Sequence, residues 1–85
     1  MPAKAYVLIR TAQGLTKAIY HTLKANSAAQ SVEMITGPYD LIVAIEAAST
    51  NDILKMIMND IRPAASVRDT VTCLVIPVGN QTSAG

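Results

Sequence analysis

The 85-residue chain is predicted to be one α+β domain of the ferredoxin-like type, with the element order β-α-β-β-α-β. Three observations predict this fold. Four short, apolar and β-branched segments alternate with two segments whose apolar residues recur every three to four positions. A Gly37-Pro38 corner joins the middle two strand segments into an antiparallel hairpin. Two crossovers around this hairpin give a four-stranded antiparallel sheet with both helices on one face.

The first half is expected to run strand, helix, strand. A strand over Lys4–Thr11 is broken by Ala12-Gln13-Gly14, and a helix follows over Thr16–Ala25. The apolar stripe of this helix is Leu15, Ala18, Ile19 and Leu23. Asn26-Ser27 ends the helix, because both residue types prefer turns to helix interiors. Ser31–Thr36 then forms the second strand.

The second half is expected to run strand, helix, strand. The third strand is Tyr39–Ala47, and Ser49 caps the second helix with Asp52 three residues later. Its apolar stripe is Ile53, Leu54, Ile57, Met58 and Ile61, and Pro63 ends it. The last strand is Val67–Ile76. We therefore expect a domain over residues 1–78 and a frayed polar tail over residues 79–85.

Composition narrows the class of protein. Hydrophobic residues make up 51% of the chain, and with no Phe or Trp the core is expected to be aliphatic. The net charge of +1, with basic residues scattered along the chain, argues against a direct nucleic-acid binder. The single cysteine, Cys73, excludes an intramolecular disulfide and is expected to be buried. Without an apolar stretch of ~18 residues or a secretion signal, the protein is expected to be cytoplasmic and not in a membrane.

The strands are apolar on both of their faces. In the first strand Tyr6 and Leu8 lie on one alternation and Val7 and Ile9 on the other. Two helices cover one face of a four-stranded sheet, so the second apolar face would meet water in a monomer. Burying a few hundred Å² at ~25 cal/mol per Å² yields several kcal/mol, comparable with the stability of such a domain. The sequence therefore predicts a two-fold dimer with facing sheets, or a higher oligomer.

Residues for catalysis or metal binding are sparse. The chain has one histidine, His21, on a polar helix face, and one cysteine, with no close-spaced ligand set. Gly14 and Gly37 are isolated, so no phosphate-cradling loop is expected. No nucleophile elbow and no evident buried carboxylate pair occur. We predict no catalytic residue, no metal and no cofactor.

The hairpin corner is the candidate binding site. Asp40 can accept hydrogen bonds from an ammonium group, and the hydroxyls of Thr36, Thr70 and Thr72 can hold a carboxylate or a side-chain tip. Charge-assisted bonds of this kind suit a small zwitterion. In the alternative interpretation Asp40 only caps the turn and Tyr39 only packs across the strands. Residue types alone leave both interpretations open.

The stretch Thr36-Gly37-Pro38-Tyr39-Asp40, with Ile45, resembles the Gly-x-Tyr-Asp-x-x-x-x-Val motif of the Lrp/AsnC effector domain, the RAM domain. Val67-x-x-Thr70-x-Thr72 and the apolar residues after it are similar to that domain's last strand. The resemblance covers about Ala3–Ile76. It implies a sheet-to-sheet α+β barrel dimer that assembles further and binds amino acids near the corner.

Carried across by this resemblance, the ligand-binding residues are Thr36, Gly37, Tyr39, Asp40, Thr70 and Thr72. Two departures matter. Pro38 removes one backbone donor, and Ile45 replaces the motif's valine. The helix-turn-helix typical of the family is missing, so the chain resembles stand-alone effector modules, although a fragment of a longer protein is the other interpretation.

Three functional hypotheses follow. The first is an effector module that binds a small amino acid between subunits and co-assembles with full-length Lrp/AsnC regulators of amino-acid metabolism. The second is a purely structural oligomerisation module. The third is a small dimeric α+β barrel enzyme, which would need an acid or base inside the barrel.

Overall fold

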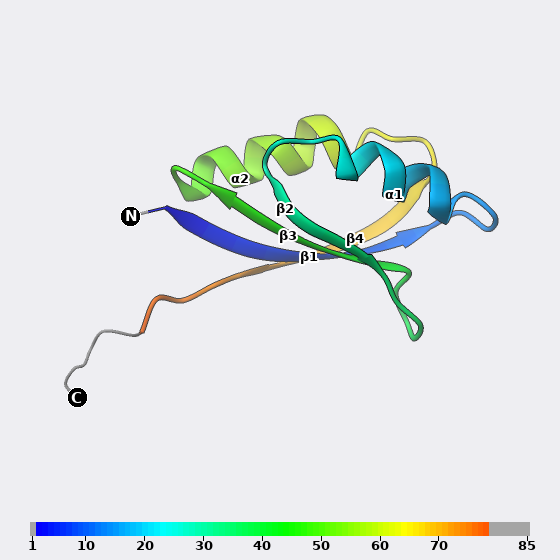
Figure 1. Ribbon diagram of the computed structural model, residues 1–85, viewed down its shortest axis with the longest axis horizontal. Coiled ribbons are helices and arrows are strands. Elements are labelled where there is room, and N and C mark those ends of the chain that lie inside the picture. Colours follow the sequence, from blue (N-terminus) through cyan, green and yellow to red (C-terminus); the bar gives the residue numbers. More distant parts are fainter. Residues whose placement is uncertain (1, 79–85) are drawn as a thin grey trace.

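The computed structural model describes residues 2–78 and has the predicted element order. The elements are β1 (Ala3–Thr11), α1 (Thr16–Lys24), β2 (Ala29–Met34), β3 (Leu41–Ala47), α2 (Thr50–Met56), a π-helical turn η1 (Ile57–Ile61) and β4 (Val67–Leu74). The sheet order is β2-β3-β1-β4 and each neighbouring pair is antiparallel. Both helices cover the same face (Figure 1). The ferredoxin-like fold is therefore confirmed, while the predicted tail over residues 79–85 lies outside the described residues.

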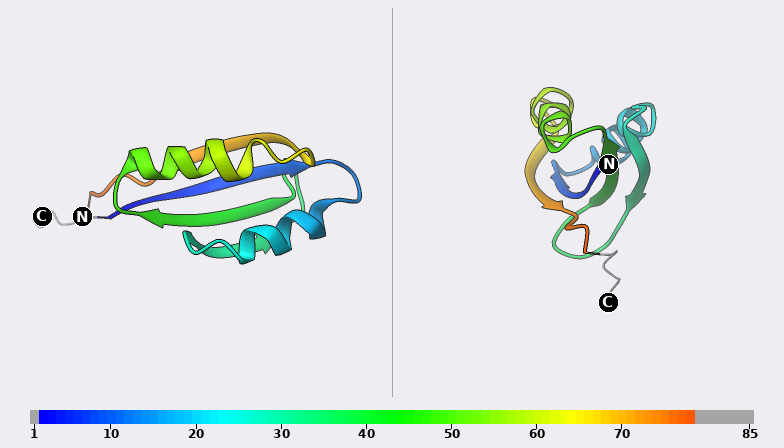
Figure 2. Two further views of the ribbon diagram at one scale, coloured as in Figure 1. Left: turned by 90° about the horizontal axis from the view of Figure 1, so that it is seen from above. Right: turned by 90° about the vertical axis from the view of Figure 1, so that its left-hand side faces the viewer.

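The core lies between the helices and the sheet, and it is aliphatic as predicted. Strand β1 runs through its middle, with Val7 paired to Val43 on one side and to Thr72 on the other. The two helices lie over opposite halves of the sheet, so that seen from above the central strands run between them (Figure 2). The buried core residues are Ala5, Val7, Ile9, Ile19, Leu23, Val32, Leu41, Val43, Ile45, Ile53, Met56, Ile57 and Ile61.

Helix α1 is held by fewer residues than its sequence pattern suggests. Ile19 and Leu23 are buried, but Leu15 and Ala18 are exposed, so this part of the predicted stripe is wrong. The helix has only nine residues and begins after Leu15, so one pair at a spacing of four faces the sheet. Tyr20 packs against the core instead.

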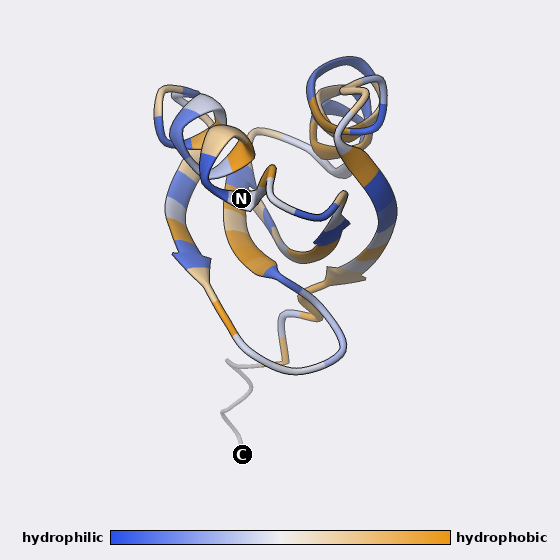
Figure 3. Ribbon diagram, turned by 90° about the vertical axis from the view of Figure 1, so that its right-hand side faces the viewer, coloured by the Kyte–Doolittle hydropathy of each residue, from blue (hydrophilic) through white to orange (hydrophobic). Residues whose placement is uncertain are grey.

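The loop of the hairpin is longer than predicted, because β2 ends earlier, at Met34, and β3 begins later, at Leu41. Strand β2 begins at Ala29 because the Asn26 side chain accepts a 2.9 Å hydrogen bond from the Ala28 backbone N–H and closes the turn early. The loop between β2 and β3 covers residues 35–40, so Tyr39 lies in the loop and not in the strand. This loop extends away from the helices, on the opposite side of the sheet (Figures 1 and 3).

Helix α2 begins as predicted and ends differently. The Ser49 hydroxyl accepts a 3.2 Å hydrogen bond from the Asp52 backbone N–H, which confirms the cap. Its last turn widens into η1, where the Arg62 N–H donates to the Ile57 carbonyl at 2.8 Å. The buried residues of α2 and η1 are Ile53, Met56, Ile57 and Ile61. Leu54 and Met58 are exposed, so their assignment to the buried stripe is wrong.

The face of the sheet without helices is open, and Cys73 lies on it. Cys73 is exposed, so the prediction that it is buried is wrong for the single chain. It pairs with Tyr6 across β1 and β4, and Tyr6 is itself exposed. The alternation that puts Val7 in the core therefore places both residues on the other face.

Candidate ligand-binding site

The predicted corner is fixed at its base and open at its tip. The Ile35 N–H donates to the Asp40 carbonyl at 2.9 Å, and the Asp40 N–H donates to the Ile9 carbonyl at 2.9 Å. Between these anchors Thr36, Gly37 and Pro38 are exposed. Gly37 has φ +133°, a conformation that L side chains rarely adopt. The glycine of the motif is therefore required by the backbone of this loop.

The Asp40 carboxylate ties the loop to the end of β1. Its Oδ2 accepts hydrogen bonds from the Thr11 backbone N–H at 2.8 Å and from the Thr11 hydroxyl at 3.3 Å. The Thr11 hydroxyl also lies 2.6 Å from that of Thr16, at the start of α1. This supports the interpretation in which Asp40 is structural. The other carboxylate oxygen, Oδ1, takes no part in these bonds.

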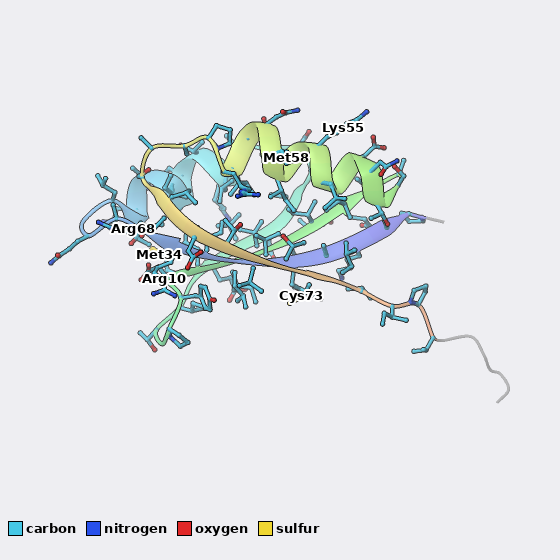
Figure 4. All side chains as sticks on the ribbon, turned by 180° about the vertical axis from the view of Figure 1, so that it is seen from behind. Arg10, Met34, Lys55, Met58, Arg68 and Cys73 are labelled. Carbon is cyan, nitrogen blue, oxygen red and sulfur yellow. The ribbon has the colours of Figure 1, made fainter. Side chains whose placement is uncertain are left out.

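Tyr39 lies against a charged pair on the open face. The Arg10 guanidinium is 5.3 Å from the centroid of the Tyr39 ring, within the range of a cation–π contact. Arg10 also forms an ion pair with Asp69 at 3.5 Å. Figure 4 places Arg10 on the side of the sheet from which the hairpin loop extends. The hairpin, β1 and β4 are thus joined at one end of the sheet.

Thr70 and Thr72 lie on the opposite face, towards the helices. They pair with Ile9 and Val7, which are fully buried on that side. Because β4 is an edge strand, these threonines are only partly covered and line a groove of about 430 Å³ beside α2 and η1. The groove is lined by Leu54, Ile57, Met58, Arg62, Val67, Arg68, Asp69, Thr70 and Thr72.

The six predicted site residues therefore form two groups within one chain. Thr36, Gly37, Tyr39 and Asp40 belong to the hairpin, and Thr70 and Thr72 belong to the groove. Tyr39 lies against Arg10 on the open side of the sheet, Asp40 is bonded to Thr11 at the end of β1, and the two threonines line the groove on the helical side. The structure does not bring the two groups together in a single protomer.

Of the residues that line the groove, the sequence predicts only Thr70 and Thr72 as site residues. The apolar pattern places Leu54 and Met58 in the core, and Arg62 and Arg68 belong to the basic residues that are scattered along the sequence. The missing information is the packing of α2 and η1 beside β4, which brings residues of all three elements to one groove. The predicted stripe has five apolar residues, whereas a surface helix usually has three to four in two turns. This excess indicates that some of the five are exposed.

Metal-binding clusters and membrane-spanning helices are both absent from residues 2–78. No group of three or more His, Cys, Asp or Glu side chains is placed to hold a metal ion in that range. No helix there is long and apolar enough to cross a membrane.

The fold defines the class of the protein as a small ferredoxin-like α+β domain. The family model described as the Lrp/AsnC ligand binding domain matches residues 4–82, and the chain belongs to this family. This is a family of regulatory ligand-binding domains and not a family of enzymes. The resemblance drawn from the hairpin motif is thereby confirmed. No curated protein matches the chain.

Solved structures of similar fold come in two sizes. FFRP-DM1 is 28% identical with a TM-score of 0.85, covering 87% of this chain and 99% of that one. A hypothetical protein from Pyrococcus horikoshii is 29% identical with a TM-score of 0.83, covering 89% and 90%. A transcriptional regulator from Neisseria meningitidis, solved as an L-Met complex, is 12% identical with a TM-score of 0.81. The alignment covers 98% of this chain and 55% of that regulator.

Proposed function

We propose that the protein is a regulatory effector module that binds a small amino acid in a pocket shared between protomers. The module comprises residues 1–78, and it acts on transcription of amino-acid metabolism through full-length Lrp/AsnC regulators, without contacting DNA itself. We expect it in the cytoplasm. The family assignment and the L-Met complex of the Neisseria regulator support an amino-acid ligand.

The observation that carries this proposal is the separation of the hairpin from the groove. Asp40 is the acceptor suited to a ligand ammonium, and Thr70 and Thr72 are hydroxyls suited to the rest of the molecule. Asp40 is bonded to Ile9 and Thr11 on the β3 side of β1, whereas Thr70 and Thr72 pair with β1 from its other side and line the groove beside α2. A pocket that uses both therefore needs the hairpin of one chain and the groove of another. A pocket of that kind forms only in an oligomer.

The open face supplies a surface for the first step of assembly. Its centre is apolar, with Tyr6, Leu8, Ile42, Val71 and Cys73 on strands β1, β3 and β4. Charged residues surround this centre, namely Lys4, Arg10, Glu46 and Asp69. An apolar centre with a polar rim is the usual composition of a protein interface. We propose a two-fold dimer through this face, with further association of dimers.

The test is thermal unfolding of the full chain against each of the twenty amino acids, with light scattering for the mass. A ligand at a hundredfold excess over Kd stabilises the native state by ~2.7 kcal/mol, which is a clear shift of the midpoint. Thr72→Val removes a groove hydroxyl with little change of shape, so it should abolish the shift while the oligomer persists. Full response of this variant would refute the pocket assignment.

One observation favours a second function, a structural oligomerisation module without a ligand. Asp40 is already engaged by the backbone and hydroxyl of Thr11, which accounts for the carboxylate without a ligand. This alternative predicts that no amino acid changes either the stability or the mass of the oligomer.

A further inference from the structure

We propose that the groove between β4 and α2–η1 selects amino acids whose side chain ends in a carboxylate, and that Arg62 and Arg68 recognise this charge. The groove is the one that contains Thr70 and Thr72. The inference deepens the proposed function and rests on it, because it assigns a ligand class to the same pocket.

The groove is electropositive. Arg62 and Arg68 line it, and Asp69 is its one acidic lining residue. The Asp69 carboxylate forms an ion pair with Arg10 at 3.5 Å, at the rim of the opposite face. Among residues 2–78, Arg10–Asp69 is the only ion pair. Within this part of the chain Arg62 and Arg68 are therefore not paired with a carboxylate. Arginine is the side chain best suited to bind a carboxylate through two parallel hydrogen bonds.

The shape of the groove suits a short aliphatic segment that carries the charge. Leu54 and Met58 are 41% and 62% exposed, although both are large and apolar. They form an apolar wall against which the methylene groups of a side chain can pack. Arg62 follows directly after η1, where its N–H donates to the Ile57 carbonyl, and it lines the same groove. Such turns recur at functional sites.

Charge also fixes which part of the ligand enters the groove. An ammonium between two arginines would be repelled, and its desolvation would not be offset by an acceptor. The ammonium of the ligand therefore belongs with Asp40 of another protomer, and the acidic side chain belongs in the groove. Basic amino acids are excluded by the same argument.

The experiment compares matched pairs of ligands that differ in one charge. Isothermal titration of the full chain with L-glutamate and L-glutamine, and with L-aspartate and L-asparagine, is done at one fixed ionic strength. Acids should bind more tightly than amides by roughly tenfold, as expected for a charge-assisted contact. Equal affinity of acid and amide would overturn the inference and leave the proposed function intact.

Substitutions of the two arginines test whether the groove causes the preference for acidic amino acids. Arg62→Gln and Arg68→Gln should each weaken L-glutamate binding several-fold and leave L-glutamine binding unchanged. Lys55→Gln is the matched control, because it removes the same charge from the outer side of α2 and Lys55 does not line the groove (Figure 4). An equal loss in the Lys55 variant would mean that only the net charge of the protein matters, which overturns the inference.

A third ligand separates the two proposals. 2-Oxoglutarate has the two carboxylates of glutamate and lacks the ammonium group. If it binds as tightly as L-glutamate and depends on both arginines, the groove assignment stands and the amino-acid function fails. Weaker binding than L-glutamate supports both. If none of the five compounds binds, the inference fails, and the thermal unfolding test with all twenty amino acids decides the proposed function.

Discussion

Asp40 is the residue on which the hairpin depends, and its role in stability can be separated from a role in binding. Asp40→Ala should lower the free energy of unfolding by about 1–3 kcal/mol, because it leaves the N–H of the nearly buried Thr11 without its acceptor. Asp40→Asn retains an oxygen acceptor and should cost less. Urea unfolding of both variants measures the difference.

Asp69→Asn is the control for this prediction. The Arg10–Asp69 pair has side chains 48% and 56% exposed, so its loss should change the stability by less than ~1 kcal/mol. If Asp69→Asn proved as damaging as Asp40→Ala, the account of the hairpin anchor would be wrong. Because Asp40 also stabilises the fold, Asp40→Ala would change stability and binding together. Thr72→Val is therefore the better test of ligand binding.

At the scale of single residues the sequence revealed the hairpin better than the groove. Gly37, Tyr39 and Asp40 are spaced within one loop, so a local motif contains them all. Arg62 and Arg68 come together with Leu54 only after α2 and β4 have packed. Their proximity depends on tertiary packing, so no local sequence pattern predicts it.

Among the elements, α2 has the clearest sequence signal at its start. Ser49→Ala should lower the free energy of unfolding by roughly 1 kcal/mol, since the Asp52 N–H loses its side-chain acceptor. Thr50→Ala at the next exposed position removes no such bond and favours helix, so it should be neutral or stabilising. Thermal unfolding should therefore show a lower midpoint for Ser49→Ala and no decrease for Thr50→Ala, and equal shifts would contradict the cap.

The end of the same helix was not predictable in the same way. A regular α-helix places every fourth or third residue on one face, and η1 departs from this spacing by one residue. Ile61 is in the core at 1% exposure, as its place in the apolar stripe predicts, and Asp60 lies outside, where it accepts a 3.1 Å bond from Asn26. Element order and most element positions followed from periodicity, whereas the π-helical hydrogen bond of the last turn did not.

For the whole molecule the decisive surface is the open face of the sheet. Val71→Lys should disperse the proposed dimer, because it places a charge among Leu8 and other apolar residues that would become buried. Sedimentation or light scattering at several concentrations measures the mass. Ala18→Lys, on the exposed side of α1, should leave the oligomer unchanged. An unaltered mass for the Val71 variant would rule out this face as the interface.

The proposed pocket, shared between two chains, has a consequence for how such a module would respond in the cell. A binding site completed by a second chain fills only as subunits meet, so occupancy rises with the amount of protein as well as with the amount of nutrient. By linkage, the nutrient in turn holds the subunits together. Dilution alone would then empty the pocket. A change in expression of the module would change the concentration of amino acid at which the pocket is half filled.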